Sequence, residues 1–231
     1  MEQLTERVIR GLSRVPADNR FIVGIVGYPG AGKSTLAQGL VQALNARLPS
    51  EQRAQILPMD GYHLPNHTLD RLGLRALKGI PDTFDPLGFT QLLMQIRQSP
   101  PLSVLAPAFD RSIDGSVPDA IEIGRDTRVI VAEGNYLLLE KEEWCKIADL
   151  LDDSWFLDTS LETIRPRLIS RHVEGGRELA AAIAKVESTD LPNAMLIEQT
   201  RRRAMVLVSA VETPQPAGCR QYQIVSQQSE I

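Results

Sequence analysis

The sequence predicts a three-layer α/β/α fold, in which a mainly parallel sheet of five strands is packed between helices. Short apolar runs alternate along the chain with longer stretches of helical periodicity, and such β-then-α units form parallel sheets with helices on both faces. The run at 21–26 is apolar throughout, which is typical of a strand buried on both faces. The expected strands cover residues 21–26, 54–59, 103–106, 128–132 and 155–157.

The predicted helices come from apolar residues that recur every three or four positions. In the second of them, Leu36, Leu40 and Leu44 lie on one face. Asp85 and Pro86 are expected to open a helix, because an aspartate at the N-cap and a proline at the first position favour a helix start. The expected helices cover residues 2–15, 33–48, 87–98, 160–172, 177–187 and 192–204.

Two segments of the chain show no clear period. Residues 61–85 are rich in Gly, Pro, His and Asp, and a loop of this length inside a compact domain is usually functional or mobile. Residues 212–231 are rich in Gln, Ser and Pro, and we interpret them as a tail. Within that tail, residues 222–225 leave open an additional strand at the edge of the sheet.

The length and the net charge of the chain limit which classes of protein it can belong to. A chain of 231 residues is interpreted as a single domain over 1–231, with its core at about 20–210. The formal net charge of −4 lacks the basic excess of a general nucleic-acid binder. No apolar run approaches the roughly 18 residues of a membrane span, and no secretory signal precedes the first helix. The sequence therefore predicts a cytoplasmic protein, with an organellar matrix left open.

The two cysteines carry no recognisable chemistry. Cys145 and Cys219 lie far apart and outside any Cys/His cluster. Neither a zinc site nor a disulfide framework is therefore expected.

A glycine-rich motif directly follows the first strand. Residues 27–34 match G-x-x-x-x-G-K-[ST] between a buried strand and a helix, which is the context that a P-loop requires. Its glycines let backbone N–H groups turn toward phosphate oxygens, and the helix N-terminus adds partial positive charge. Lys33 is expected to reach the β- and γ-phosphates of ATP, and the Ser34 hydroxyl to ligate Mg²⁺. The sequence therefore predicts a P-loop NTPase. The residues assigned to the nucleotide here are Gly27, Gly30, Ala31, Gly32, Lys33, Ser34 and Thr35.

Two carboxylates follow other predicted strands. Glu133 ends the strand at 128–132, and Asp60 ends the strand at 54–59. Because the carboxyl ends of parallel strands meet at one edge of the sheet, both are expected beside the P-loop. Glu133 is expected to hold or orient Mg²⁺, and the alternative is a loop or capping carboxylate. Asp60 is expected to take the proton of an acceptor hydroxyl, and the alternative is an Asx turn.

With these elements in this order, the sequence resembles the P-loop kinases of the phosphoribulokinase, uridine kinase and pantothenate kinase group. Within that group it is most similar to the uncharacterised bacterial kinases described as fructose-transport-associated. The resemblance covers about residues 20–210, and its D-G-Y and T-F-D segments are specific to the kinase group. The segments that carry it are 27–35, 59–63, 78–85, 107–111, 133–136 and 167–177.

The resemblance implies roles position by position. Asp60 matches the catalytic aspartate of the family, and Glu133 matches its acidic residue near the metal. Asp85 falls where relatives bind substrate hydroxyls, and Phe109 and Arg111 fall in the segment that walls the acceptor pocket. The residues expected on the acceptor side are Tyr62, His63, Lys78, Asp85, Phe109 and Arg111.

Three residues of the aperiodic segment also suggest a kind of acceptor. They are His63, His67 and Lys78, which suit an anionic acceptor group. The alternative is a solvated loop.

A basic segment at about 163–180 is expected to form a small helical lid. The resemblance matches Arg167, Arg171 and Arg177 with a basic lid over the phosphates. Arg167 and Arg171 are four residues apart and can share a helix face, and the glycine pair at 175–176 can act as a hinge. Arg171 is expected to act in catalysis by bringing charge to the transferring phosphoryl group. The alternative is a solvated basic helix.

The predicted function is an ATP- and Mg²⁺-dependent kinase. Its acceptor is a hydroxyl of a small metabolite such as a sugar, a nucleoside or a pantothenate-like compound, which the sequence does not name. The alternative is a non-catalytic or regulatory P-loop ATPase, and a GTPase is disfavoured because no N-K-x-D motif occurs. No nucleic acid or membrane is expected as a partner, and a homodimer is left open. The residues expected to carry catalysis are Asp60, Lys33 and Arg171.

Overall fold

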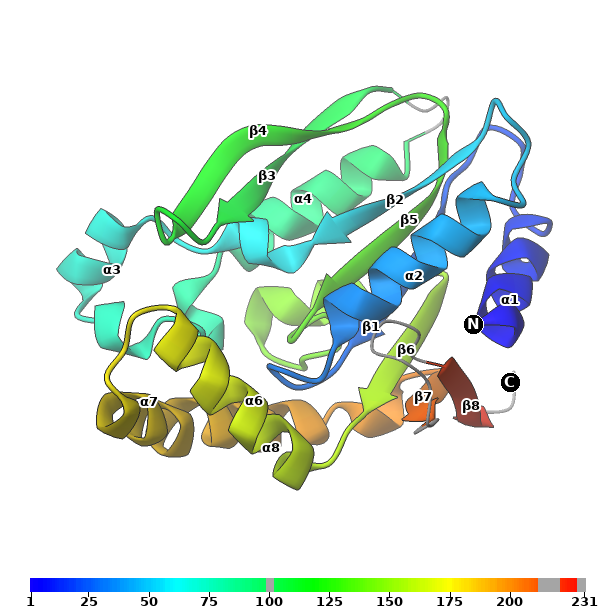
Figure 1. Cartoon of the computed structure of the whole chain (residues 1–231). Coiled ribbons are helices and arrows are strands. Elements are labelled where there is room, and N and C mark those ends of the chain that lie inside the picture. Colours follow the sequence, from blue (N-terminus) through cyan, green and yellow to red (C-terminus); the bar gives the residue numbers. More distant parts are fainter. Residues whose placement is uncertain (99–101, 212–220, 228–231) are drawn as a thin grey trace.

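The computed structural model describes residues 1–98, 102–211 and 221–227. In these ranges, six strands form one sheet in the order β2-β5-β1-β6-β7-β8 (Figure 1). All neighbouring pairs are parallel except β7 and β8. The predicted α/β class with a mainly parallel sheet is confirmed. The strands are β1 (Phe21–Val26), β2 (Arg53–Pro58), β5 (Thr127–Gly134), β6 (Asp153–Asp158), β7 (Val206–Val211) and β8 (Gln221–Gln227).

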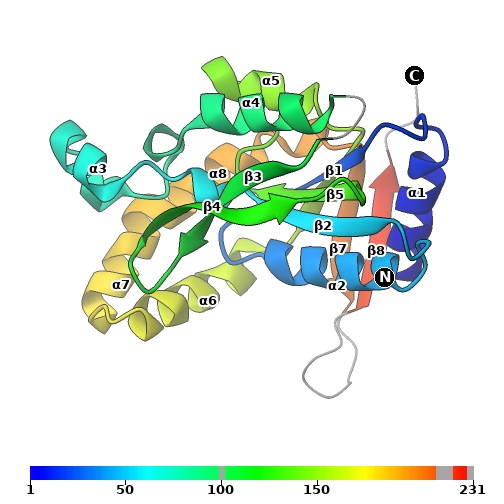
Figure 2. The same ribbon diagram turned by 90° about the horizontal axis from the view of Figure 1, so that it is seen from above.

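Helices cover both faces of this sheet. Figure 2 shows α1 and α2 on one side and α4 and α5 on the other. The aperiodic segment contains α3 and short 3-10 turns rather than one extended loop, and a π-helical turn at Val186–Asp190 joins α7 to α8. The helices are α1 (Glu2–Leu12), α2 (Lys33–Asn45), α3 (Asn66–Leu72), α4 (Pro86–Ile96), α5 (Cys145–Ala148), α6 (Leu161–Glu174), α7 (Leu179–Lys185) and α8 (Leu191–Glu198).

The predicted strand at 103–106 does not belong to the main sheet. It is part of β3 (Val104–Asp110), which pairs only with β4 (Gly115–Ile123) in a separate antiparallel hairpin. The physical reason is Pro107, which lies inside β3 and has no N–H to donate to a central ladder. This hairpin stands beside the 3-10 turn that follows β2, and it thereby helps to build the site.

Two strands of the main sheet, β7 and β8, were not among the five that we predicted. The run at 206–211 is apolar and β-branched, yet it directly follows the long helical stretch and was not separated from it. The edge strand left open at 222–225 is confirmed as β8, which runs antiparallel to β7. The rest of the predicted tail, 212–220 and 228–231, lies outside the described residues.

Burial follows the order of the strands. Every residue of β1 is buried, and β5 and β6 are buried along almost their whole length. Such two-sided burial is what helices on both faces of a parallel sheet produce. Among the described residues, no helix is both long and apolar enough to cross a membrane.

Candidate active site

The P-loop connects the buried β1 to α2. Lys33 is the first residue of α2, and Gly32 precedes it with φ 103°. Gly30 has φ 75°, and a Cβ at this position would lie 3.3 Å from the side chain of Leu168 in α6. A glycine is therefore required there both by the backbone and by the close packing of α6. Ala31 is buried, whereas Ser34 and Thr35 are exposed at the start of α2.

The Lys33 ammonium lies on the inner side of this loop. Its Nζ donates to the carbonyl oxygens of Gly27 at 3.1 Å and Tyr28 at 3.0 Å, and to Asn135 Oδ1 at 2.6 Å. Burial lowers the pKa of Lys33, while the carboxylates of Glu133 and Asp60 raise it. Asn135 was not among the predicted site residues, although its place two residues after Glu133 was a signal.

Ser34 and Glu133 form the pair that the metal assignment requires. Ser34 Oγ donates to Glu133 Oε1 at 2.9 Å. Glu133 is 8% exposed, and burial raises its pKa, while Lys33 nearby lowers it. The pairing register of β1 and β5 explains why Ser34 and Glu133 lie close together, because Val26 at the end of β1 lies beside Gly134 at the end of β5. A hydroxyl and a carboxylate are hard oxygen donors of the kind that Mg²⁺ takes beside nucleotide phosphates, so the residues fit this ion.

Asp60 lies in a 3-10 turn, Met59–Tyr62, directly after β2. It is close enough to Lys33 and Glu133 to act on the pKa of both. The next residue, Gly61, fixes the distance to the hairpin, because a Cβ there would lie 2.2 Å from the carbonyl oxygen of Pro107. Asp60 is thus placed beside the P-loop by a backbone contact between the turn and β3.

The acceptor-side residues surround an aromatic cluster. The His63 ring lies 3.9 Å from the Phe84 ring and 4.8 Å from the Phe109 ring, measured between centroids. His63 Nδ1 is 2.8 Å from the carbonyl oxygen of Asp60. Tyr62 packs edge-to-face on Phe89 at 5.1 Å. The structure therefore brings His63 and Phe109 together beside the backbone of Asp60, while Tyr62 packs on α4.

The other three predicted acceptor residues, Asp85, Lys78 and Arg111, lie in three different settings. The Asp85 carboxylate caps α4 by accepting from the Gly88 N–H at 2.9 Å, and the residue is exposed. Lys78 is held by the hairpin and by α3 rather than left pointing into solvent. Arg111 is exposed at the hairpin turn, and its charge lowers the pKa of Glu133.

The basic segment of the predicted lid lies on α6 and just beyond it. Arg171 is exposed, and its charge lowers the pKa of Lys33, so it lies within electrostatic range of the P-loop lysine. Arg167 donates to the carbonyl oxygen of Gly30 at 3.5 Å. Arg177 instead lies near Lys185 of α7, whose pKa its charge lowers. Arg167 therefore contacts the P-loop, and Arg171 acts on its lysine through charge.

The segment after the lid contacts the backbone of the acceptor segment. Lys185 Nζ donates to the carbonyl oxygens of Ala76 at 2.8 Å and Lys78 at 3.3 Å. Asn193 is buried and donates to the carbonyl oxygen of Gly79 at 3.3 Å. Sequence reasoning did not find these contacts, because residues more than a hundred positions apart carry no shared pattern.

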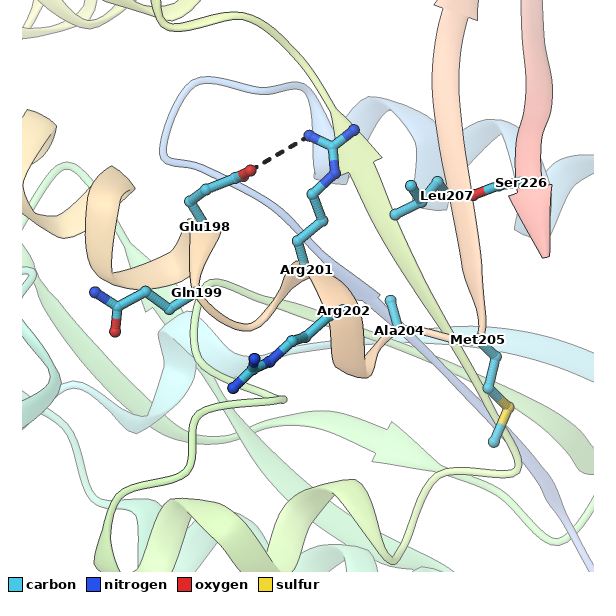
Figure 3. A pocket seen from close by; sticks show the side chains of 8 residues that line it. All are labelled: Glu198, Gln199, Arg201, Arg202, Ala204, Met205, Leu207 and Ser226. Carbon is cyan, nitrogen blue, oxygen red and sulfur yellow. Dashed lines mark ion pairs between the residues drawn. The ribbon is translucent and has the colours of Figure 1, made fainter. Parts of the chain in front are cut away.

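A hollow of about 650 Å³ lies apart from these residues, beside the start of β7 (Figure 3). Two of its lining residues reach the P-loop region. Glu198 accepts from the hydroxyl of Tyr28, and Arg201 binds the Asp158 carboxylate at 2.6 and 2.9 Å. The hollow is lined by Glu198, Gln199, Arg201, Arg202, Ala204, Met205, Leu207 and Ser226.

P-loop proteins that phosphorylate an alcohol need a nucleotide cradle and, next to it, a group that can accept the alcohol proton. Here the cradle follows β1 and Asp60 follows β2, with β5 between them in the sheet, and this arrangement places the chain in the class of P-loop kinases. No family model matches the chain. Individual proteins do match the chain, and they show which group of P-loop kinases it resembles.

One relative is the "Putative uridine kinase C227.14" of Schizosaccharomyces pombe, 34% identical over 198 residues, which cover 82% of this chain and 83% of that protein. A pantothenate kinase of Streptomyces coelicolor is 30% identical over 157 residues, covering 65% of this chain and 47% of that protein. A solved structure from Silicibacter sp. TM1040, described as a "putative fructose transport system kinase", has a TM-score of 0.78 and 36% identity, covering 85% of this chain and 93% of that one.

The chain therefore belongs to the P-loop kinase family that includes uridine kinases, pantothenate kinases and phosphoribulokinases. It is an ATP-dependent phosphotransferase with an alcohol group as acceptor.

Proposed function

We propose that this kinase transfers the γ-phosphate of Mg²⁺-bound ATP to a hydroxyl of a small metabolite of the sugar, nucleoside or pantothenate-like kind. The observation that carries the proposal is the Ser34–Glu133 pair at 2.9 Å, beside a buried Lys33 and within the electrostatic reach of Asp60. This arrangement puts phosphate-binding, metal-binding and proton-accepting groups at adjacent strand ends.

On the phosphate side, the P-loop N–H groups and Lys33 hold the β- and γ-phosphates. Ser34 and Glu133 would hold Mg²⁺, which when bound offsets charge on the phosphate oxygens. Lys33 is already oriented by Gly27, Tyr28 and Asn135. To bind phosphate, its Nζ must exchange one of these three oxygens for a phosphate oxygen, while the remaining ones keep the ammonium in place, which is the condition for effective electrostatic stabilisation.

On the acceptor side, Asp60 accepts the proton of the attacking hydroxyl. A bond forms between that oxygen and the γ-phosphorus, the bond to the β-phosphate oxygen breaks, and ADP leaves. Arg171 on α6 adds charge near the transferring group, since it already acts on Lys33 in this structure. We propose that α6 and the segment beyond it form the lid that excludes water during transfer.

The decisive experiment measures ADP release from the purified protein with Mg²⁺-ATP and a panel of sugars, nucleosides, pantothenate and related alcohols. We expect at least one acceptor to raise ADP release about a hundredfold or more over acceptor-free protein, in line with typical kinase turnover. No stimulation by any of them would contradict the proposal.

The metal assignment has a separate test. Glu133→Gln keeps an acceptor for the Ser34 hydroxyl but removes the charge. The Mg²⁺ concentration for half-maximal activity should rise about tenfold or more. An unchanged Mg²⁺ dependence would remove Glu133 from the metal site.

A further inference from the structure

Lys78 carries the charge that an anionic acceptor would need, but the protein already uses it. Its Nζ donates to Asn66 Oδ1 at 2.8 Å and to the Asp114 carbonyl oxygen at 2.6 Å, and it lies 3.1 Å from Asp114 Oδ1. An ammonium has three protons, so these three oxygens match its donor capacity. The side chain is 12% exposed, and its Nζ lies 5.0 Å from the centre of the Phe109 ring. Lys78 therefore fastens the acceptor segment to the hairpin with its charge offset.

His63 offers the acceptor a lone pair rather than a charge. The carbonyl oxygen of Asp60 can only accept, so Nδ1 at 2.8 Å must carry a proton. The ring is packed against Phe84 and Phe109, and burial lowers its pKa. At neutral pH the ring is uncharged, and its Nε2 is then a hydrogen-bond acceptor.

The other cations of this region are exposed or already opposed by carboxylates. Arg71 and Arg75 are exposed, and Arg75 lies within 3.8 Å of Asp70 and 3.6 Å of Asp114. Arg111 is exposed on the metal side, where it acts on Glu133.

The lid side of the segment adds one more cation. Lys185 donates to two backbone carbonyls, and Asp190 offsets its charge. Apart from Arg111 on the metal side, the groups that remain for a substrate carry no positive charge: Asp60, Asp85 and neutral His63 accept hydrogen bonds, and the Tyr62 hydroxyl can both donate and accept.

We infer that the acceptor of this kinase is an uncharged polyhydroxy compound that donates hydrogen bonds to His63 and Asp85. This inference rests on the proposed kinase function and narrows it. A phosphate or carboxylate in the same place would meet the carboxylates of Asp60 and Asp85, and it would have to displace Asp114 from Lys78.

The experiment compares acceptors in matched pairs that share their free hydroxyls and differ in one anionic group. Suitable pairs are pantothenol with pantothenate, ribose with ribose 5-phosphate, and fructose with fructose 6-phosphate. For each pair, kcat/KM is measured at saturating Mg²⁺-ATP. We expect the neutral member of the preferred pair to exceed the anionic member about tenfold or more, as a like charge at short range implies.

One variant tests whether Asp114 is the cause. Asp114 has φ 47°, a conformation that asparagine also tolerates, and its backbone carbonyl still accepts from Lys78 in Asp114→Asn. This variant should raise the ratio of anionic to neutral kcat/KM about threefold to tenfold. Asp126→Asn is the matched control, since Asp126 pairs with Arg53 at 3.0 Å near the start of β2, away from the catalytic strand ends. It should leave the ratio unchanged.

The outcomes separate the two proposals. An anionic member that is phosphorylated as well as or better than its neutral partner overturns the inference and leaves the kinase function standing. An unchanged ratio in Asp114→Asn overturns the role given to the Lys78–Asp114 pair. Phosphorylation of no member of any pair counts against the kinase function, and against the inference with it.

Discussion

Lys33 on the phosphate side and Lys78 on the acceptor side are both held by protein oxygens, but only Lys33 takes two of them from a local motif. Lys33 binds the carbonyls of Gly27 and Tyr28, six and five positions away, and also Asn135 Oδ1, 102 positions away. Lys78 binds Asn66 and Asp114, 12 and 36 positions away. The two loop carbonyls of the first arrangement belong to one short segment that is visible as a motif. The second depends on how a hairpin and an irregular segment pack together, and this difference predicts which changes affect chemistry and which affect assembly.

The largest effect is expected at the junction of the two sides. Asp60→Asn keeps the shape of the side chain but removes its ability to accept a proton, so kcat should fall by about 10²–10⁴-fold. ATP affinity, measured by calorimetry, should stay within a few-fold. If ATP binding is lost instead, Asp60 belongs to the metal site and is not the general base.

A somewhat smaller loss of activity is expected on the phosphate side itself. Lys33→Ala removes the charge that faces the phosphates, and phosphoryl transfer should fall by about 10²–10³-fold. Circular dichroism should be unchanged, because the loop carbonyls that Lys33 binds can accept from water. Full activity in the purified variant would refute the role.

On the acceptor side, adding one methyl group should lower the stability of the fold more than it lowers the rate of phosphoryl transfer. Gly61→Ala would put a Cβ 2.2 Å from the Pro107 carbonyl, so we expect a loss of about 1–3 kcal/mol in the free energy of unfolding and a raised acceptor KM. Gly39→Ala is the control, because a Cβ there meets only the flexible end of Met1. Equal denaturation midpoints for the two variants would contradict the close approach.

The smallest effect concerns pH. Because the pKa of His63 is lowered in the folded protein, the unfolded chain binds this proton first as the pH falls below about 6.5. The stability that His63 contributes is therefore full above that pH and declines as the pH falls toward its folded pKa. His63→Asn, which can still donate to the Asp60 carbonyl, should flatten this decline in urea titrations between about pH 4.5 and 7.5. His67→Asn, at an exposed site, should not.

The phosphate side was largely predictable from the sequence, because its determinants are local. A buried strand, a glycine loop and a helix start occur in order around Lys33, and Glu133 ends a recognisable strand. The parallel sheet then brings these ends together without further information. The N-cap role of Asp85 was likewise predictable, and it is confirmed by the bond from the Gly88 N–H.

The acceptor side could be predicted only as a set of candidates. Lys78 and His63 were expected to suit an anion because their residue types can carry charge. Asp114 becomes a neighbour of Lys78 only through the hairpin, whose second strand has no clear apolar pattern. The Asp60 carbonyl reaches His63 through the local 3-10 turn at Met59–Tyr62, which was not predicted. The strand at 206–211 was missed for a related reason, because its apolar run continues a helical stretch.

The lid-side contacts to the acceptor segment have a consequence for how this kinase can diversify. Lys185 and Asn193 bind the carbonyl oxygens of residues 76, 78 and 79, not their side chains. Replacing the side chain at position 76 therefore leaves both bonds of Lys185 in place. Ancestral or laboratory variants can therefore exchange the side chain at position 76 while the same two residues keep the segment docked.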